Sequence, residues 1–292
     1  MLGNCLRILN FDNSLTKQKT LLSRYKAEVA DLTTLAPAAR FWLDKATKNE
    51  IKKRLDSSRR NCITFLGSGD FHQVSNILIN QFDEPICLIV FDFHPDWYVL
   101  PPALGCGSWL NATLKSKNIL KCVSIGASSD DISNFWTQTG DLRSLKNKRL
   151  EIYPYSHRPS QVFFKKIYWD ELKNKNLKDF ITGVLNKLPS KNVYVSVDKD
   201  CLKREFAITN WEEGSLRLDE LISMLKLIKE NANIIGMDIT GDYSKGCIKG
   251  VIKRFFSYLD HPKKVAADNL SEAAITAINE ETNLKILQAL FS

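Results

Sequence analysis

Short apolar runs without polar alternation recur along the chain, separated by longer segments with a helical period. A β-strand that is covered on both faces reads as a continuous apolar run of this kind, as in parallel sheets. The runs that predict strands span residues 6–11, 62–66, 86–91, 122–125, 150–153, 193–197 and 234–239. They predict a sheet that is buried on both sides.

The segments between these runs predict amphipathic helices. The clearest spans residues 219–228, where two acidic residues stand at the start and apolar residues then recur on one face. Residues 177–188 and 270–290 show a similar pattern, and we expect the second helix to break near Thr282 and Asn283.

Strand and helix signals alternate over the whole length, with no linker, repeat or low-complexity block between them. The 292 residues, of which 44% are hydrophobic, suffice for a continuous core. We therefore expect one domain over residues 1–292. Its predicted class is α/β, a three-layer α/β/α sandwich with a mostly parallel central sheet.

The charge of the chain is modestly positive, at +8 from 41 lysines and arginines against 33 acids. The densest basic run, within residues 52–60, predicts the exposed face of a helix, and no aromatic platform accompanies it, so we expect no nucleic-acid partner. No apolar run approaches the ~20 residues of a membrane span, and Asp12 and Lys17 interrupt any secretory signal. We expect a cytoplasmic protein without membrane contact.

The seven cysteines are widely spaced and form no C-x-x-C pair. This spacing argues against a structural zinc site and against a disulfide framework. Cys62, Cys87 and Cys122 lie within apolar runs, so we expect them to be buried thiols.

Polar residues cluster where three of the predicted strands end. The segments are Gly67-Ser68-Gly69-Asp70-Phe71-His72, Asp92-Phe93-His94-Pro95-Asp96 and Asp198-Lys199-Asp200. Function in parallel sheets sits at the carboxyl ends of the strands, so these segments meet at one edge. Two of the four histidines of the chain fall in them, whereas His157 and His261 lie in polar or proline-flanked loops and receive no role.

The spacing of these residues indicates a metal site. In extended chain alternate side chains point the same way, so Asp92, His94 and Asp96 converge, and so do Asp198 and Asp200. Converging carboxylates would repel one another at a high cost unless a cation neutralises them. A set of carboxylates and imidazoles without thiolate suits Mn²⁺ best, with Fe²⁺, Co²⁺ or Zn²⁺ as alternatives.

The three segments resemble the motifs of the ureohydrolase superfamily, which includes arginase and agmatinase. The superfamily carries a G-G-D-H-S histidine, then D-x-H-x-D, then S-x-D-x-D. The counterparts here are 69–72, 92–96 and 196–200, in the same order along the chain. The resemblance covers most of the chain. It implies an arginase-like fold and points to a divergent branch near the peptide arginases.

The resemblance also implies a binuclear metal centre and a reaction. Two Mn²⁺ ions would be held by His72, Asp92, His94, Asp96, Asp198 and Asp200. A hydroxide bridging the ions would attack a guanidinium carbon and release urea, with Asp96 accepting the proton. The expected substrate is a small guanidino compound or an arginine side chain, free or within a peptide. Relatives of this kind are often homo-oligomers, but no interface can be identified in this sequence.

The chain departs from arginases at two places near the expected site. Gly105-Cys106-Gly107-Ser108-Trp109 replaces the H-G-x-P segment, so an imidazole is missing there, and we expect Cys106, Ser108 and Trp109 to contact substrate. The glutamate that holds the guanidinium aligns with Gly241, and we expect the neighbouring Asp242 to replace it. The segment 209–214 would line the mouth of the site, with Glu213 contacting substrate.

Three other functions stay open. One is a metal-dependent amide hydrolase or deacetylase on the same fold, although the chain lacks the paired histidines of such enzymes. Another is a cysteine enzyme built on Cys106, which would need a base close by. The third is a non-catalytic binding relative. A dinucleotide-binding loop is rejected, because His72 stands where the last glycine of G-x-G-x-x-G would be. Trp97, Trp109 and Trp211 are expected either at the mouth or in the core.

Overall fold

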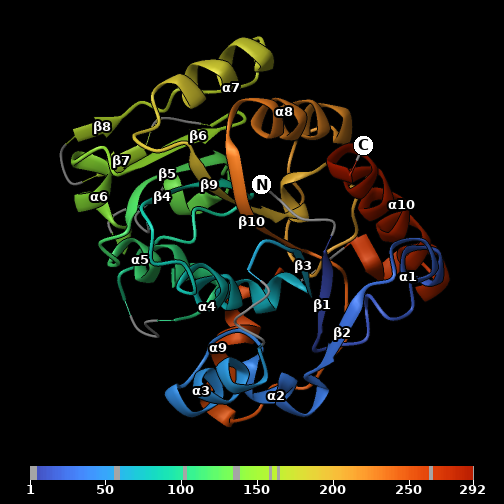
Figure 1. Ribbon diagram of the computed structural model, residues 1–292. Coiled ribbons are helices and arrows are strands. Elements are labelled where there is room, and N and C mark those ends of the chain that lie inside the picture. Colours follow the sequence, from blue (N-terminus) through green and yellow to red (C-terminus); the bar gives the residue numbers. More distant parts are fainter. Residues whose placement is uncertain are drawn as a thin grey trace.

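The computed structural model describes residues 5–55, 60–100, 104–133, 139–157, 160–162, 165–262 and 266–291. Its centre is an eight-stranded sheet in the order β2-β1-β3-β10-β9-β4-β5-β6, and every neighbouring pair is parallel (Figure 1). The strands are β1 (Leu6–Asn10), β2 (Glu28–Asp31), β3 (Ile63–Gly67), β4 (Ile86–Phe91), β5 (Ile119–Gly126), β6 (Leu150–Pro154), β9 (Asn192–Asp198) and β10 (Asn233–Thr240). The predicted parallel sheet is confirmed.

The seven apolar runs of the sequence all form strands of this sheet, and β4 has the predicted bounds. The eighth strand, β2, was not predicted, because it lies at the sheet edge and is largely exposed, so it has no apolar run. β7 (Ser160–Val162) and β8 (Lys165–Ile167) form a separate antiparallel pair.

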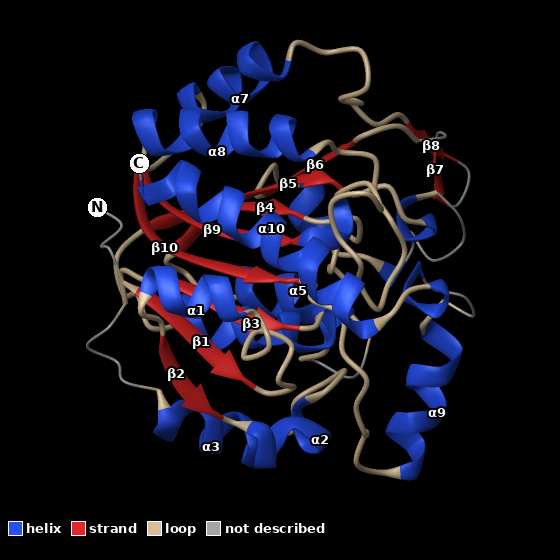
Figure 2. Ribbon diagram, turned by 90° about the vertical axis from the view of Figure 1, so that its right-hand side faces the viewer, coloured by secondary structure: helices blue, strands red, loops and turns tan. Residues whose placement is uncertain are grey.

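Helices cover both faces of the sheet, so the three-layer α/β/α arrangement is confirmed (Figures 1 and 2). One core layer contains apolar residues of α1 (Lys19–Tyr25), α7 (Leu177–Asn186), α8 (Leu218–Asn231) and α10 (Glu272–Phe291). The other contains residues of α3 (Lys45–Arg54), α4 (Ser75–Ile79) and α5 (Trp109–Leu114). The remaining helices are α2 (Ala36–Ala39), α6 (Leu142–Lys146) and α9 (Val251–Asp260).

The predicted break in the last helix is wrong, because α10 runs without interruption through Thr282 and Asn283. Both polar side chains are buried and bonded: Thr282 donates to the carbonyl of Phe206, and Asn283 Nδ2 donates to Gln18 Oε1 at 2.9 Å. They therefore attach the helix to the body of the protein. None of the helices in the described ranges is long and apolar enough to cross a membrane.

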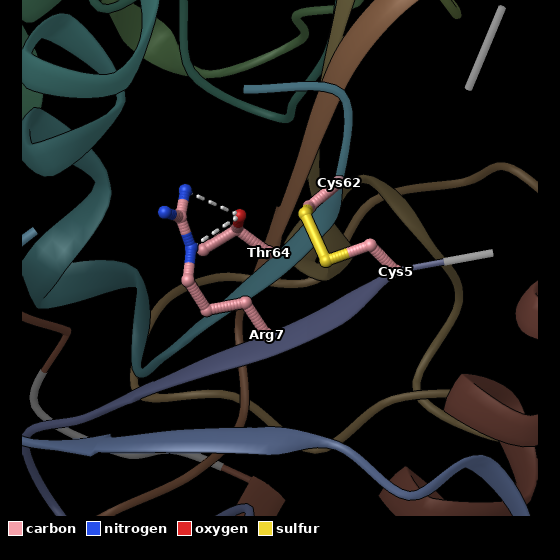
Figure 3. Close-up of a disulfide and its surroundings, with 4 residues drawn as sticks. All are labelled: Cys5, Arg7, Cys62 and Thr64. Carbon is pink, nitrogen blue, oxygen red and sulfur yellow. Dashed lines mark hydrogen bonds between the residues drawn. A yellow bond between two sulfur atoms is a disulfide. The ribbon is translucent and has the colours of Figure 1, made fainter. Parts of the chain in front are cut away.

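The prediction for Cys62 also needs correction, since Cys62 forms a disulfide with Cys5 (Figure 3). The two cysteines precede Leu6 and Ile63, which are register partners in the adjacent strands β1 and β3. Their Cα atoms lie 4.7 Å apart, within the range of a disulfide. Cys87 and Cys122 are buried free thiols, as predicted.

Candidate metal centre

The three polar segments follow β3, β4 and β9, and they meet at the carboxyl edge of the sheet. β9 lies between β4 and β10, and β10 separates it from β3, so the three strand ends are close neighbours. All strands of the sheet are parallel, and their carboxyl ends therefore point to the same side.

The segment after β3 forms a short 3-10 helix, η2 (Gly69–Val74), which contains both Asp70 and His72. Asp70 turns away and pairs with Arg40, and Phe71 is buried in a stack on Phe11, with ring centroids 4.6 Å apart. His72 is left facing the other strand ends. The extra residue Phe71 is thus accommodated as a buried anchor of the loop.

The other two segments converge by turning, which corrects the expected extended geometry. Asp96 has a left-handed backbone with φ of 45°, and Asp92 Oδ1 accepts a bond from the backbone of His94 at 2.7 Å. After β9, Asp198 Oδ1 accepts a bond from the backbone of Asp200 at 3.0 Å. The carboxylates therefore cap tight turns and still face one another.

Six side chains come together in two groups that share Asp92. His72 Nδ1 lies 3.2 Å from Asp92 Oδ2, 3.1 Å from Asp96 Oδ2 and 3.6 Å from Asp198 Oδ2. His94 Nδ1 lies 2.9 Å from Asp200 Oδ2 and 3.8 Å from Asp92 Oδ1. His72, Asp92 and Asp198 form one set that could hold an ion, and Asp92, His94 and Asp200 form the other.

These carboxylates are buried and poorly neutralised by the protein. Burial raises the pKa of Asp92 well above its usual range, and the charges of Asp96 and Asp200 raise it further. Burial and the charge of Asp200 raise the pKa of Asp198 to about 7. Carboxylates that repel one another in this way are a common property of sites that await a cation.

The outer nitrogens of both imidazoles are also held. His72 Nε2 lies 2.9 Å from Ser196 Oγ, which donates to Asp238 Oδ1 at 2.7 Å. His94 Nε2 lies 3.1 Å from Glu212 Oε2. Such partners fix the orientation of a histidine ring and direct Nδ1 toward the carboxylates, where a cation would bind.

A cavity of about 120 Å³ opens above these groups. Further acids line it beside the six converging residues, namely Asp130, Asp131, Glu212 and Asp260, together with Tyr98, Cys106 and Trp211. Among the described residues, no lysine or arginine lines this cavity. It therefore favours a cationic group.

The sequence matches the model of the arginase family over residues 45–241. The chain belongs to the arginase family. The match spans the elements that carry all six converging residues, and it confirms the resemblance inferred from the motifs.

Individual relatives are distant. The chain is 29% identical over 182 residues to an uncharacterized protein of Thermotoga maritima, in a match that covers 62% of this chain and 58% of that relative. This chain thus spans less than two thirds of the relative's length.

Solved structures of the arginase family share the fold. An arginase from Bacillus subtilis superposes with a TM-score of 0.59 at 14% identity, covering 97% of this chain and 98% of that one. A formimidoylglutamase from Bacillus subtilis gives 0.59 at 15% identity, covering 98% and 86%. A Trypanosoma cruzi formiminoglutamase with Mn²⁺ gives 0.56 at 13% identity, covering 98% and 94%. At these identities the likeness establishes the fold.

Of the four residues expected to contact substrate, the structure places Cys106 at the cavity and the other three elsewhere. Ser108 is buried and accepts a bond from the backbone of Gly105. Trp109 lies behind the carboxylates, where its Nε1 donates to Asp96 Oδ2 at 2.5 Å. Glu213 lies 3.9 Å from Arg204, and its neighbour Glu212 lines the cavity instead.

The expectation for Asp242 is corrected as well, since this acid does not reach the cavity above the six converging residues. Its carboxylate is buried and pairs with Lys199 Nζ at 2.9 Å, while Gln18 Nε2 donates to it at 2.6 Å. Gly241, which aligns with the family's glutamate, has φ of 91°, and a Cβ there would lie 2.5 Å from Asp198 Oδ1. No side chain fits at that position with this backbone.

Two features of the site were missed from the sequence. His261, to which no role was given, bonds to Asp70 Oδ1 at 2.7 Å and stacks on Trp211 with ring centroids 4.1 Å apart. Asp260 beside it lines the cavity. The motif Asp260-His261-Pro262 marks a helix end in the sequence, but only the fold shows that this helix end lies at the site.

Proposed function

We propose that this protein is a binuclear metal-dependent hydrolase that cleaves a guanidino group and releases urea. The observation that carries the proposal is the pair of ligand sets that share Asp92 at the base of an acidic cavity. The substrate class is a guanidino compound or an arginine side chain. The reaction consumes one water, breaks a C–N bond and leaves an amine on the substrate.

The residues fit two divalent cations. Asp92 Oδ2 is buried and accepts no hydrogen bond from the described residues, so a lone pair is left for a cation. The donor set consists of carboxylate oxygens and imidazole nitrogens, which suits Mn²⁺, with Fe²⁺, Co²⁺ and Zn²⁺ as further candidates. The presence of Mn²⁺ in a structurally similar formiminoglutamase supports the same choice.

We assign one ion to His72, Asp92, Asp96 and Asp198, and the other to Asp92, His94 and Asp200. When bound, the two ions lower the pKa of a water molecule and stabilise the negative charge that develops during the attack. Asp96 would hold the proton that the attacking water gives up. Trp109 holds the Asp96 carboxylate in place through its Nε1 bond.

The cavity wall supplies the partners for a guanidinium. A planar guanidinium donates paired hydrogen bonds to carboxylates, and Glu212, Asp131 and Asp260 present carboxyl groups there. The ring of Trp211, which stacks on His261, also lines the cavity. These groups together take the guanidinium-binding role that the sequence predicts for Asp242.

The acidity of the cavity favours a guanidinium over an acyl-amide. A neutral amide gains nothing from four additional carboxylates, whereas a cation is attracted by each of them. We therefore rank guanidine hydrolysis above amide hydrolysis.

The test is a urea-release assay on Mn²⁺-loaded protein with free arginine, agmatine, guanidinobutyrate and arginine-containing peptides. We expect urea from at least one of them and none after Asp198→Asn. Asp83→Asn serves as the control, because Asp83 is an exposed acid outside the cavity lining. If no substrate yields urea although two metal ions are bound per chain, the proposal is overturned.

A further inference from the structure

Helix α9 (Val251–Asp260) is oriented with its polar side toward the protein and its apolar side toward solvent. Its buried residues are Lys253 and Ser257. Its exposed large side chains and their exposed fractions are Val251 (73%), Ile252 (71%), Phe255 (58%), Phe256 (51%), Tyr258 (69%) and Leu259 (56%). Six of the ten large apolar side chains exposed in the described ranges lie on this one helix.

Polar contacts hold α9 in this orientation. Lys253 Nζ donates to the carbonyl of Ala38 at 2.6 Å and to that of Trp42 at 2.7 Å. Ser257 contacts His261, whose ring is bonded to Asp70. Figure 2 shows α9 standing away from the sheet. The apolar side therefore faces solvent, because the polar side is bonded to the body of the protein. A contiguous exposed apolar surface of this kind is typical of a binding site.

The C-terminal end of α9 lies at the rim of the acidic cavity. Its last residue, Asp260, lines the cavity. On the inward side of the helix, Lys253 bonds to Trp42, which pairs with Gly105, the residue before the cavity residue Cys106, so α9 lies beside the cavity wall. One ligand could thus occupy the cavity and lie along the helix.

The cavity by itself is suited to the end of a side chain. Its volume of about 120 Å³ is below the roughly 300 Å³ at which pockets for whole small ligands begin. A free amino acid would also bring its carboxylate to a rim formed by Asp130, Asp131, Glu212 and Asp260, and no lysine or arginine among the described residues lines the cavity to receive it. An arginine inside a polypeptide brings no such charge.

We propose that the apolar face of α9 binds apolar residues of a peptide substrate whose arginine side chain enters the cavity. This inference rests on the proposed guanidine hydrolysis and specifies its substrate. The acidic cavity at the end of α9 attracts the arginine side chain of a peptide, and a membrane surface offers no such group to it, so a peptide is the favoured occupant.

The test uses two fluorescent peptides of equal length, each with one central arginine, flanked in one by leucine and phenylalanine and in the other by serine and glycine. Binding to the Mn²⁺-loaded protein is followed by fluorescence anisotropy. We expect the apolar peptide to bind at least about tenfold more tightly, since burying one large apolar side chain is worth more than one tenfold step. Ile252→Ser/Phe255→Ser should remove this preference.

Two further variants complete the design. Val251→Ser/Leu259→Ser changes the same face and should have the same effect. Val29→Ser is the matched control, because Val29 is 43% exposed on the edge strand β2, and its binding should equal that of the natural chain. Thermal unfolding and the bound metal content should stay unchanged in all variants, because every substituted side chain is exposed.

Equal binding of both peptides, or unchanged binding after both α9 substitutions, would overturn the proposal. The proposal would also be overturned if light scattering showed a dimer that Ile252→Ser/Phe255→Ser dissociates, with no preference for the apolar peptide. Binding of the protein to phosphatidylglycerol vesicles through α9, in place of peptide binding, would overturn it as well. Urea release separates this inference from the proposed reaction. If the apolar peptide binds more tightly but no urea is released, the docking face is supported and the proposed hydrolysis is contradicted. If agmatine yields urea but neither peptide is preferred, the hydrolysis is supported and the docking face is contradicted.

Discussion

Two clusters of buried polar residues lie at the same edge of the sheet, one around Asp242 and one around Asp92, and their carboxylates are neutralised in opposite ways. Around Asp242, Lys199 Nζ provides a cation at 2.9 Å, and Gln18 and Asn283 donate the remaining hydrogen bonds. Around Asp92, the described residues provide two imidazoles for four aspartates. The turn after β9 supplies both clusters, because Asp198 and Asp200 point to one and Lys199 points to the other.

The difference teaches which carboxylates are structural and which await a ligand. The Asp242 cluster is complete within the protein, since its acid has a cation and its hydrogen-bond donors. The Asp92 cluster is incomplete, since burial and neighbouring charges raise the pKa of Asp92 and of Asp198, and an oxygen of Asp92 is left without a donor among the described residues. Proximity to the motif alone does not separate the two clusters, but charge balance does.

The largest expected effect is that of Asp92→Asn on catalysis. Asp92 belongs to both ligand sets, so its loss should release both ions. We expect activity to fall by about a thousandfold or more, because metal ions contribute several kcal/mol to such reactions. Urea release and metal content after dialysis measure the effect, with Asp83→Asn as the control. Retention of two ions by Asp92→Asn would contradict the assignment.

The next effect concerns stability in the Asp242 cluster. Lys199→Met should cost about 3–5 kcal/mol in the free energy of unfolding, because it leaves the buried Asp242 charge without its cation. Adding Asp242→Asn should recover part of this loss, since the amide keeps an oxygen for Gln18 and removes the charge. Denaturant unfolding of the single and double variants measures both steps. Additive losses in the double variant would show that the pair is not coupled.

A smaller effect, an increase in the free energy of unfolding, is expected for Asp92→Asn in protein from which a chelator has removed the metal ions. The substitution removes a repelling charge, and the side-chain oxygen that accepts the His94 backbone bond remains. We expect stability to rise by on the order of 1 kcal/mol, as for like charges at close range. Unfolding in EDTA checks this. Destabilisation there would mean that the protein itself neutralises the Asp92 cluster.

Much of the fold was predictable, and the exceptions have physical reasons. The strands buried on both faces, such as β4 and β9, are apolar runs that the sequence displays directly. β2 escaped because an edge strand exposed to solvent needs no apolar run. The Cys5–Cys62 bond joins residues separated by 57 positions, and only the adjacency of β1 and β3 brings them together.

The candidate site was predictable where short-range spacing determines it. The acids and histidines at the ends of β3, β4 and β9 follow from local motifs. The direction of Asp242 does not, because it depends on the left-handed Gly241 and on partners as remote as Gln18 and Asn283. His261 was missed for the same reason, since its contacts with Asp70 and Trp211 are long-range.

His261, which is bonded to Asp70 beside the cavity, gives a pH-dependent test. Burial lowers its pKa, but the Asp70 carboxylate, the Ser257 carbonyl and the charge of Asp260 together outweigh burial, so the pKa of His261 is raised. Its contribution to stability is complete below the ordinary histidine value of about 6.5 and is lost as pH rises through the raised value. We expect stability to decline above that pH by less than in the substitutions above, and His261→Gln to lack this decline. Identical pH profiles would contradict the pairing.

The smallest expected effect is that of Cys106→Ala on urea release. Burial raises the pKa of the Cys106 thiol well above its usual range, and the charges of Asp260 and Asp96 raise it further, so the thiolate needed for nucleophilic attack is suppressed. We expect activity within about threefold of the natural chain, the scale of an ordinary substitution of under 1 kcal/mol. A chelator should abolish activity in both proteins. Loss of activity in Cys106→Ala with both metal ions still bound would instead support a cysteine enzyme. The unbalanced charge around Asp92 would then no longer identify the catalytic site.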